Sequence, residues 1–368
     1  MSQLHEIAAQ FVRSGQVSTV ESLGNGNINS TYLVTLSGEA LPTGRFVLQK
    51  INTQIFRQPE LVIQNMQVLC EHLDNCAIDS TRRWEMPRIL LASTGKAFWV
   101  DEAQDYWRAI TFIEESQVFE TVESAEHARE VGYGLAMFHR LISTLPAERL
   151  ADTLEGFHIT PGYLTGYEKV LANWQAEGKS DAPRAADVQH CLDFVAQRKD
   201  WVPVLENAKA AGHLQLRPIH GDPKVNNIML GHDGRAVSLI DLDTVKPGLV
   251  HYDIGDCLRS GCNPLGEETT DWRQVTFDSA LAKAMLEGYL SLAKDFLTPQ
   301  EYDYLYDGIR LIAFELGLRF FTDYLAGNVY FKVKHPEHNL DRALVQFQLT
   351  SSIEAQEDAL KSMIESMR

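Results

Sequence analysis

The segment Arg217–Leu242 reads RPIHGDPKVNNIMLGHDGRAVSLIDL, and its polar residues decide how the rest of the chain is interpreted. It contains His220-x-Asp222, then Asn227 five residues after that aspartate, then Asp241 after a second apolar run. A carboxylate and an amide on one loop, followed by a carboxylate beyond a hairpin, can converge in space. This spacing predicts one site built from side-chain oxygens.

These oxygens suit the transfer of a γ-phosphoryl group to a hydroxyl. Such a transfer needs a carboxylate beside the acceptor and oxygen ligands for a Mg²⁺ ion that neutralises the phosphates. The catalytic loop and metal-binding aspartate of protein kinases have the same order and spacing. We therefore expect Asp222 to orient or deprotonate the acceptor hydroxyl, and Asn227 and Asp241 to hold Mg²⁺.

Neighbouring polar residues extend this hypothesis. His220 is expected to be a structural brace, and Lys224, two residues after the base, to contact the transferring phosphate. Asp243 would face the same way as the metal-binding aspartate on an extended chain, so it is a candidate for the metal site. Asp253 and Asp256 are expected to hydrogen-bond backbone near the loop.

The surrounding pattern predicts an α+β protein of two lobes. Residues 1–113 read as strands, whereas residues 114–368 carry apolar residues mainly at helical spacing. Strands first and helices later, with one catalytic hairpin embedded, indicate a bilobal, protein-kinase-like fold. We expect a small β-rich nucleotide-binding lobe (1–113) and a larger helical lobe with the catalytic loop and acceptor pocket (114–368).

Individual elements follow from local periodicity and turn residues. Pro59 should open a helix through Leu73, because the N–H that proline lacks is not needed in the first turn. Strands are expected at Val17–Ser22, Ser30–Leu36, Arg45–Ile51, Ala97–Asp101, Tyr106–Ile113, Asn227–Leu230 and Val237–Ile240. Further helices are expected at Ser124–Leu141, Gly162–Ala176, Ala185–Gln197, Val202–Ala211, Phe277–Leu292, Pro299–Tyr324 and Leu340–Met367.

Two parts of the chain resemble the aminoglycoside phosphotransferase and choline kinase superfamily. One is the loop described above, and the other is Gly24-Asn25-Gly26, which resembles that superfamily's phosphate-covering loop. Glycines there let backbone N–H groups approach phosphates, so Gly24 and Gly26 are candidate nucleotide ligands, although a hairpin turn needs glycine equally. The resemblance implies ATP and Mg²⁺ as cofactors and a small alcohol as acceptor.

Further segments resemble N-acetylhexosamine 1-kinases within that superfamily. They are FVLQKINTQIF (Phe46–Phe56), YWRAITFIEES (Tyr106–Ser116), LIDLDTVKPGLVHYDIGDCLR (Leu239–Arg259) and LRFFTDYLAGNVYFKVKHPEHNLDRALVQF (Leu318–Phe347). The resemblance implies phosphorylation of the anomeric hydroxyl of N-acetylglucosamine or N-acetylgalactosamine. It also implies that Arg319 and Tyr330 contact the sugar, which suits a guanidinium fork and a phenol. Asn27 and Asn52 are candidates for the same pocket, or else turn and cap residues.

The third predicted strand departs from the kinase pattern. Protein kinases carry V-A-I-K there, and the lysine binds the α- and β-phosphates. This strand ends in Gln49-Lys50, and only one of the two can enter the cleft because successive side chains face opposite ways. Alignment favours Gln49 and chemistry favours Lys50. In the joint between the lobes, Phe112 and Glu114 are expected to meet adenine through backbone groups.

Composition excludes several other classes of partner. The formal net charge of −17 argues against nucleic acid and against anionic membranes, both of which need clustered Lys and Arg. Five cysteines without C-x-x-C pairs favour a reducing, cytoplasmic setting. No run of apolar residues is long enough to span a membrane. We expect a monomer or small homo-oligomer.

Three functions remain. The first is the N-acetylhexosamine 1-kinase, and the second keeps the reaction but uses an aminoglycoside, choline-like or other small alcohol. A cationic acceptor would need carboxylates or an aromatic cage, whereas Arg319 favours a neutral sugar. The third is an inactive nucleotide-binding module, which has no need for Asp222, Asn227 and Asp241 together.

Overall fold

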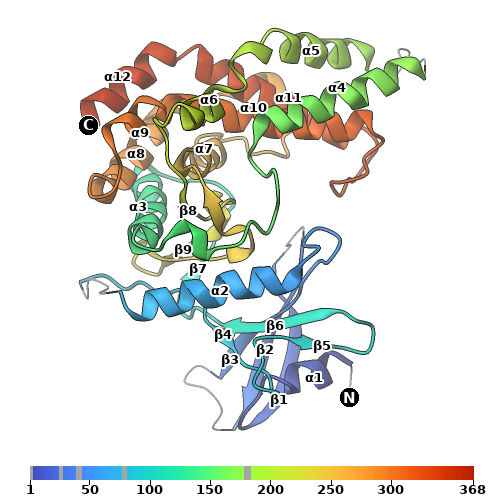
Figure 1. Ribbon diagram of the computed structural model, residues 1–368, viewed down its shortest axis with the longest axis vertical. Helices are drawn as coiled ribbons and strands as arrows, with labels where there is room; N and C mark the ends of the chain where they lie inside the picture. Colours follow the sequence, from blue (N-terminus) through green and yellow to red (C-terminus); the bar gives the residue numbers. More distant parts are fainter. Residues whose placement is uncertain (1–2, 25–27, 39–43, 77–80, 178–183) are drawn as a thin grey trace.

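The computed structural model describes residues 3–24, 28–38, 44–76, 81–177 and 184–368. Within these ranges the chain forms a small lobe built on an antiparallel sheet and a larger helical lobe (Figure 1). The prediction of a mixed α+β, two-lobed fold is confirmed. No helix in these ranges combines the length and the apolar character needed to cross a bilayer.

The small lobe is one antiparallel sheet with a helix on each face. Its strands run in the order β1-β2-β3-β6-β4, with β5 paired to β6. Apolar side chains of α1 pack on one face, which carries Phe46 and Leu48. The bounds are α1 (Gln3–Ala9), β1 (Gln16–Ser22), β2 (Ser30–Ser37), β3 (Arg45–Lys50), α2 (Pro59–Asp74), β4 (Ile89–Leu90), β5 (Trp99–Val100) and β6 (Tyr106–Thr111).

Helix α2 lies between the two lobes (Figure 1). Its buried Asn65 donates through Nδ2 to the carbonyls of Ala151 (2.8 Å) and Val245 (2.9 Å). The Asn65 Oδ1 in turn accepts from the Ala151 N–H at 2.8 Å. One amide thus uses both donor hydrogens and its acceptor on the backbone of the large lobe.

The large lobe packs around the long helix α10, which contacts α4, α7 and α11, while α3 lies against α8. Most of the buried apolar side chains belong to this core. The helices are α3 (Ala125–Ile142), α4 (Thr160–Ala176), α5 (Ala185–Ala196), α6 (Val204–Ala210), α7 (Val250–Gly261), α8 (Ser279–Ala293), α9 (Pro299–Asp303), α10 (Leu305–Leu325), α11 (His338–Glu354) and α12 (Glu357–Met367).

Short strands set into this lobe carry the catalytic segment. The predicted hairpin is present as β9 paired with β10, and β7 adds to its edge. A second ribbon, β8 with β11, closes the other end of the segment. The bounds are β7 (Ser116–Gln117), β8 (Arg217–Ile219), β9 (Ile228–Gly231), β10 (Ala236–Leu239) and β11 (Lys246–Gly248).

Some elements differ from the predictions. The expected helices from Pro299 and from Leu340 are each divided in two, into α9 with α10 and α11 with α12. The missed strands β4, β7, β8 and β11 are two or three residues long, too short for any alternation to show. Helix α7 was missed because its buried side chains include Asp253, Asp256 and Arg259, which hide its apolar periodicity.

The contact between α3 and α8 generates a stability prediction. A Cβ on Gly132 would overlap the Met285 carbonyl, so the two backbones touch directly. Gly132→Ala should lower the free energy of unfolding by about 2–3 kcal/mol, as overpacking does. Urea unfolding followed by circular dichroism measures the change.

The matched control is Gly166→Ala in α4, where an added Cβ meets no atom within 4 Å. That variant should be unchanged or stabilised by up to about 1 kcal/mol. Equal effects of the two substitutions would contradict the close contact.

Candidate active site

The catalytic loop between β8 and β9 is held from behind by one buried carboxylate. Asp253 of α7 accepts from the backbone N–H groups of His220 (2.7 Å) and Gly221 (2.8 Å). His139 of α3 lies at 2.7 Å from the same carboxylate, and Tyr289 lies at 2.8 Å from its other ring nitrogen. Asp253 therefore hydrogen-bonds the loop backbone, as expected, and His139 supports its carboxylate.

His220 connects this loop to the hairpin. Its Nε2 donates to the Ile240 carbonyl (2.9 Å), and its Nδ1 accepts from the Asp222 N–H (3.2 Å). Burial lowers the pKa of His220, which agrees with a neutral ring that donates from one nitrogen and accepts at the other. Both ring nitrogens contact backbone, which is the geometry of a brace.

Gly221 can only be glycine at this position. Its φ of +88° lies in the left-handed region, and a Cβ would stand 2.6 Å from the Thr244 carbonyl oxygen. The close approach lets the loop pass directly against the segment that follows the hairpin. Asp222 comes next in the chain, so this packing limits where its carboxylate can lie.

Asp222, Lys224 and Asn227 cluster on the loop. Lys224 donates from Nζ to Asp222 Oδ2 at 2.9 Å, and the Asn227 amide donates to the Asp222 carbonyl at 2.7 Å. The Asp222 charge is the main cause of the raised pKa of Lys224, so this lysine is a cation beside the carboxylate.

Asp241 lies one residue beyond the hairpin pair in which Ile240 N–H donates to the Asn227 carbonyl at 2.9 Å. Its backbone is left-handed, with φ of +65°, a conformation that aspartate tolerates at a small cost. The carboxyl is open to solvent although protein surrounds it on most sides. That crowding, with the Asp243 charge, raises the pKa of Asp241 to about 6, while Lys224 and Arg108 oppose the rise.

The donor set at Asn227 and Asp241 fits a magnesium ion. The Asn227 amide hydrogen bond leaves its Oδ1 unused, and no hydrogen bond from a described residue reaches the Asp241 carboxylate. Among the described residues, no group of three His, Cys, Asp or Glu side chains forms a metal site by itself. Two protein oxygens are the usual protein share for Mg²⁺ bound with phosphates.

The geometry at Asp243 differs from the expectation. Leu242–Thr244 form a short 3-10 helix, so the premise of an extended chain is wrong. The Asp243 carboxylate instead forms a buried ion pair with Arg108 of β6 and accepts from the Asn29 amide. The carboxylate thus joins the large lobe to the small one.

Gln49 and Lys50 point to opposite faces of β3. Gln49 Oε1 accepts from Arg108 Nε (3.0 Å) and Nη2 (2.7 Å), while its amide donates to Thr31 (3.2 Å). Lys50 pairs with Asp105 at 2.8 Å, and both side chains are about one-third exposed. Gln49 therefore faces the junction of the lobes and Lys50 faces away from it.

The remaining nucleotide candidates lie in the glycine segment and in the joint. Gly24 has a φ of +68°, which glycine adopts readily, whereas Gly26 lies outside the described residues, as does the pocket candidate Asn27. In the joint, Arg45 pairs with the Glu114 carboxylate and lies over the Phe112 ring, and Arg83 donates to the Glu114 carbonyl at 2.6 Å. The Glu114 carboxylate is therefore already paired with an arginine.

Asn52 has the contacts of a turn residue. Its Oδ1 accepts from the Gln54 N–H at 3.0 Å, and its own N–H donates to the Asn29 side chain at 2.9 Å. The side-chain nitrogen of Asn52 donates to the Ile28 carbonyl at 3.3 Å. These contacts favour the turn interpretation over the pocket interpretation.

His158 is a supporting residue for which the sequence suggested no role. Its Nδ1 lies 3.0 Å from Glu315, and its Nε2 lies 2.7 Å from the Gly221 carbonyl. Since a carboxylate and a carbonyl only accept, both ring nitrogens donate. Burial opposes the ring charge, but Glu315 prevails and raises the pKa of His158. The ring connects α10 to the catalytic loop.

Arg319 follows Glu315 by one turn of α10 and makes no hydrogen bond or ion pair with any described residue. Its guanidinium instead lies about 5 Å from the ring centres of Phe157 (5.1 Å) and Tyr163 (5.0 Å), and 5.6 Å from that of Phe331. The Asp222 charge also acts on it. The Arg319 guanidinium thus lies near the catalytic loop with N–H groups that donate to no described residue.

Asp323, one further turn along, holds the loop that carries Tyr330. Its Oδ1 accepts from the backbone N–H groups of Val329 (2.9 Å) and Tyr330 (2.8 Å), and its Oδ2 from that of Phe331 (3.0 Å). The Tyr330 side chain is 51% exposed and meets the Phe331 ring edge-on. The loop backbone is fixed while its aromatic tip is open.

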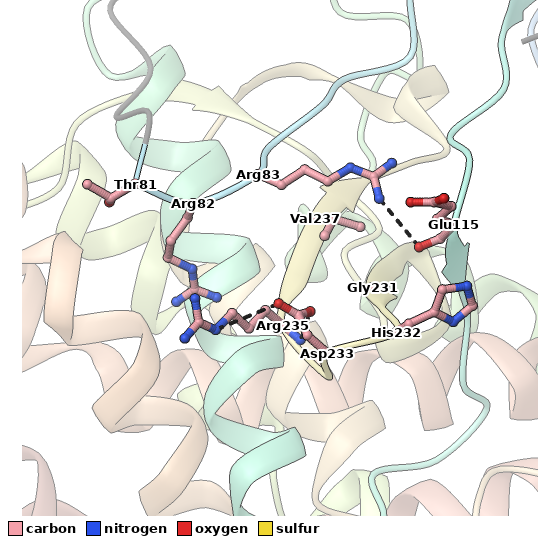
Figure 2. Close-up of a pocket in the computed structure, with 9 residues that line it drawn as sticks. All are labelled: Thr81, Arg82, Arg83, Glu115, Gly231, His232, Asp233, Arg235 and Val237. Atoms are coloured by element: carbon pink, nitrogen blue, oxygen red, sulfur yellow. Dashed lines mark hydrogen bonds and ion pairs between the residues drawn. The ribbon is translucent and has the colours of Figure 1, made fainter.

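A cavity of about 360 Å³ lies elsewhere, where the joint meets the turn of the β9–β10 hairpin (Figure 2). Its arginines already have partners: Arg82 with Glu130, Arg83 with Glu85 and joint carbonyls. None of the predicted site residues lines it. The lining residues are Thr81, Arg82, Arg83, Glu115, Gly231, His232, Asp233, Arg235 and Val237.

Sequence reasoning missed several functional groups that left a readable signal. Glu315 and Asp323 were missed although they lie four residues before and four after the predicted Arg319, in a helix that is otherwise largely apolar, so the three share one face. Arg108 stands between Trp107 and Ala109 in a buried strand. A charge at such a position is almost never buried unless it is paired.

The solved structures of several known proteins share the two-lobed fold of this chain. An aminoglycoside phosphotransferase from Alicyclobacillus acidocaldarius has a TM-score of 0.65 at 16% identity, over 100% of this chain and 97% of that one. A choline kinase from Cryptosporidium parvum has a TM-score of 0.58 at 13% identity, over 94% and 91%. A spectinomycin phosphotransferase in complex with ADP and spectinomycin has a TM-score of 0.56 at 11% identity, over 97% and 99%.

At these identities the structures show the kinase-like fold and nothing finer. The family described as Phosphotransferase enzyme family (APH) matches residues 19–295, which include the covering loop, the catalytic loop and the hairpin. A match over that much of the chain, with the loop and hairpin oxygens brought together, shows that this protein belongs to the phosphotransferase enzyme family.

Proposed function

We propose that the protein is an ATP-dependent kinase that phosphorylates the anomeric hydroxyl of an N-acetylhexosamine to give the sugar 1-phosphate. The observation that supports this acceptor is the state of Arg319. Its guanidinium donates no hydrogen bond to a described residue, and its charge interacts with that of Asp222. A guanidinium framed by aromatic rings can hydrogen-bond sugar oxygens, and rings beside it can stack on a pyranose face.

The proposed mechanism relies on positioning and charge. Asp222 orients the acceptor hydroxyl and receives its proton, while Lys224 places a positive charge beside the transferring group. Asn227 and Asp241 would hold Mg²⁺, which would supply charge neutralisation for the phosphates. His220, Gly221 and Asp253 keep the loop in register so that the acceptor oxygen and the Asp222 carboxylate can meet.

The second candidate, a cationic acceptor such as an aminoglycoside or choline, fits this pocket less well. The aromatic rings that would stabilise a cation already surround the Arg319 guanidinium. A second positive charge there would be repelled. An inactive nucleotide-binding module is also disfavoured. Asp222, Asn227 and Asp241 lie together, and each keeps a side-chain oxygen that accepts no hydrogen bond from a described residue.

An acceptor panel tests the substrate directly. Purified protein and MgATP should convert N-acetylglucosamine or N-acetylgalactosamine to a 1-phosphate, located by phosphorus NMR, and leave kanamycin and choline unmodified. Glucose tests the contribution of the acetamido group. Phosphate attached at another carbon would refute the anomeric assignment, and turnover of choline alone would favour the second candidate.

Asp222→Asn should lower kcat by about 10²–10⁴-fold, because the amide cannot accept the hydroxyl proton. The dissociation constant for ATP, measured by calorimetry, should change little. Turnover close to that of the wild-type protein would remove Asp222 from its assigned role.

Arg319→Met should raise the KM for the acceptor about ten- to a hundredfold and leave the KM for ATP unchanged, as expected for a lost charge-assisted hydrogen bond. The control is Arg310→Met on the same helix, where the arginine pairs with Asp307 and lies over Trp201 instead. Equal acceptor KM values for the two variants would contradict a sugar contact.

His158→Asn should lower kcat at least tenfold while nucleotide affinity stays constant, because the Gly221 carbonyl loses its donor. Asparagine suits the comparison since His158 has a φ of +65°, and asparagine tolerates left-handed backbone. Full activity in a folded His158→Asn protein would show that the ring does not position the catalytic loop.

A further inference from the structure

We propose that Arg108 of β6 binds the nucleotide phosphates, in the role that a lysine of β3 has in protein kinases; this inference rests on the proposed ATP-dependent kinase function. Protein kinases place that lysine on the strand corresponding to β3. In this chain the inward-facing residue of β3 is Gln49, which carries no charge. The structure supplies a cation from the next strand instead.

The register of the sheet places Arg108 beside that position. Gln49 and Arg108 are directly paired across β3 and β6, and their side chains are hydrogen-bonded to each other. The neighbours Trp107 and Ala109 point to the opposite face, where they pack in the core under α1. Arg108 therefore faces the junction between the lobes, on the same side as Gln49.

Three elements lie around the Arg108 guanidinium, two in direct contact with it and the third through Asp243. Gln49 holds it from β3, and Asp243 holds it from the segment just after Asp241. The Asp243 carboxylate also accepts from Asn29, which lies at the foot of the segment expected to cover the phosphates. In a kinase-like fold these three elements surround the triphosphate, so a cation fixed among them lies beside it.

The guanidinium retains one nitrogen, Nη1, whose two N–H donors are unused. Arg108 is 1% exposed, and its Nη1 makes no hydrogen bond, while Nε and Nη2 are occupied by Gln49 and Asp243. A buried donor without a partner is costly unless an acceptor meets it. A phosphate oxygen is such an acceptor, and arginine is well suited to it.

Charge balance points the same way. Asp222, Asp241 and Asp243 bring several negative charges to a site that must also accept a triphosphate. Two cations pair with these carboxylates: Lys224 with Asp222, and Arg108 with Asp243. Lys224 is on the acceptor side, paired with Asp222, which leaves Arg108 for the side of the small lobe.

Lys50 is the competing candidate, and its contacts exclude it. It pairs with Asp105 at 2.8 Å on the face of β3 that carries Leu48, and its side chain is 37% exposed. To reach the junction of the lobes it would have to pass through the sheet.

The test is a comparison of ADP with adenosine in EDTA, with affinities measured by calorimetry. Arg108→Gln should weaken ADP binding about ten- to a hundredfold and leave adenosine binding within twofold, because only the phosphates lose a partner. Arg88→Gln, which removes an arginine paired with Asp74, is the control and should bind both ligands like the wild-type protein. Lys50→Gln should also change ADP affinity by less than twofold.

A paired-charge design separates phosphate binding from stability, since Arg108→Gln leaves Asp243 buried without its partner. Asp243→Asn should keep most of the ADP affinity, while the double variant Arg108→Gln/Asp243→Asn should fold and still bind ADP weakly. Equal weakening of ADP and adenosine, unchanged ADP binding in the double variant, or a loss confined to Lys50→Gln would each overturn the proposal. Absence of ADP binding by the wild-type protein even when Mg²⁺ replaces EDTA would overturn the kinase function as well, whereas unchanged ADP binding by Arg108→Gln in an active kinase overturns this inference alone.

Discussion

The site depends on the two hydrogen bonds by which the buried Asp253 carboxylate accepts from the backbone of His220 and Gly221. A carboxylate removed from water is stable only when its oxygens are satisfied, and here His139 completes the set. The interaction fixes the turn immediately before Asp222. It acts on the backbone N–H groups of His220 and Gly221, so it does not depend on a side chain of the loop to place the turn.

From that anchor, a series of directed contacts extends to the two sides of the candidate site, where the acceptor and the nucleotide are proposed to bind. On the acceptor side, His158 connects the Gly221 carbonyl to Glu315 of α10, and the same helix presents Arg319. On the nucleotide side, Asp243 extends from the segment after the hairpin to Arg108. Helix α10 packs against α4, α7 and α11 among other elements, and its rise sets the spacing between Glu315 and Arg319.

Much of this could be predicted from sequence, and the failures have physical causes. The loop and hairpin were predictable because His220, Asp222, Asn227 and Asp241 are close in sequence and their spacing reflects local geometry. The residues that support the site were not, since Glu315 and Arg108 lie more than 90 residues from His220 and are brought to His158 and Asp243 only by tertiary packing. The prediction of an extended chain at Asp243 was wrong because Asp241 has a left-handed backbone and a 3-10 turn follows it. The side chains of residues 241 and 243 therefore do not point the same way, as they would on a strand.

The loop that carries Tyr330 is held by the Asp323 carboxylate, which accepts from the backbone N–H groups of Val329, Tyr330 and Phe331. Tyr330 contributes only its N–H to these hydrogen bonds, and its exposed side chain is not needed for them. Tip residues can therefore be exchanged without loss of the anchor. In a family whose members act on chemically different alcohols, such a tether lets the residues at the loop tip change while the backbone of the loop keeps its position. New acceptors become accessible through substitutions at the tip, while the phosphoryl-transfer apparatus stays intact.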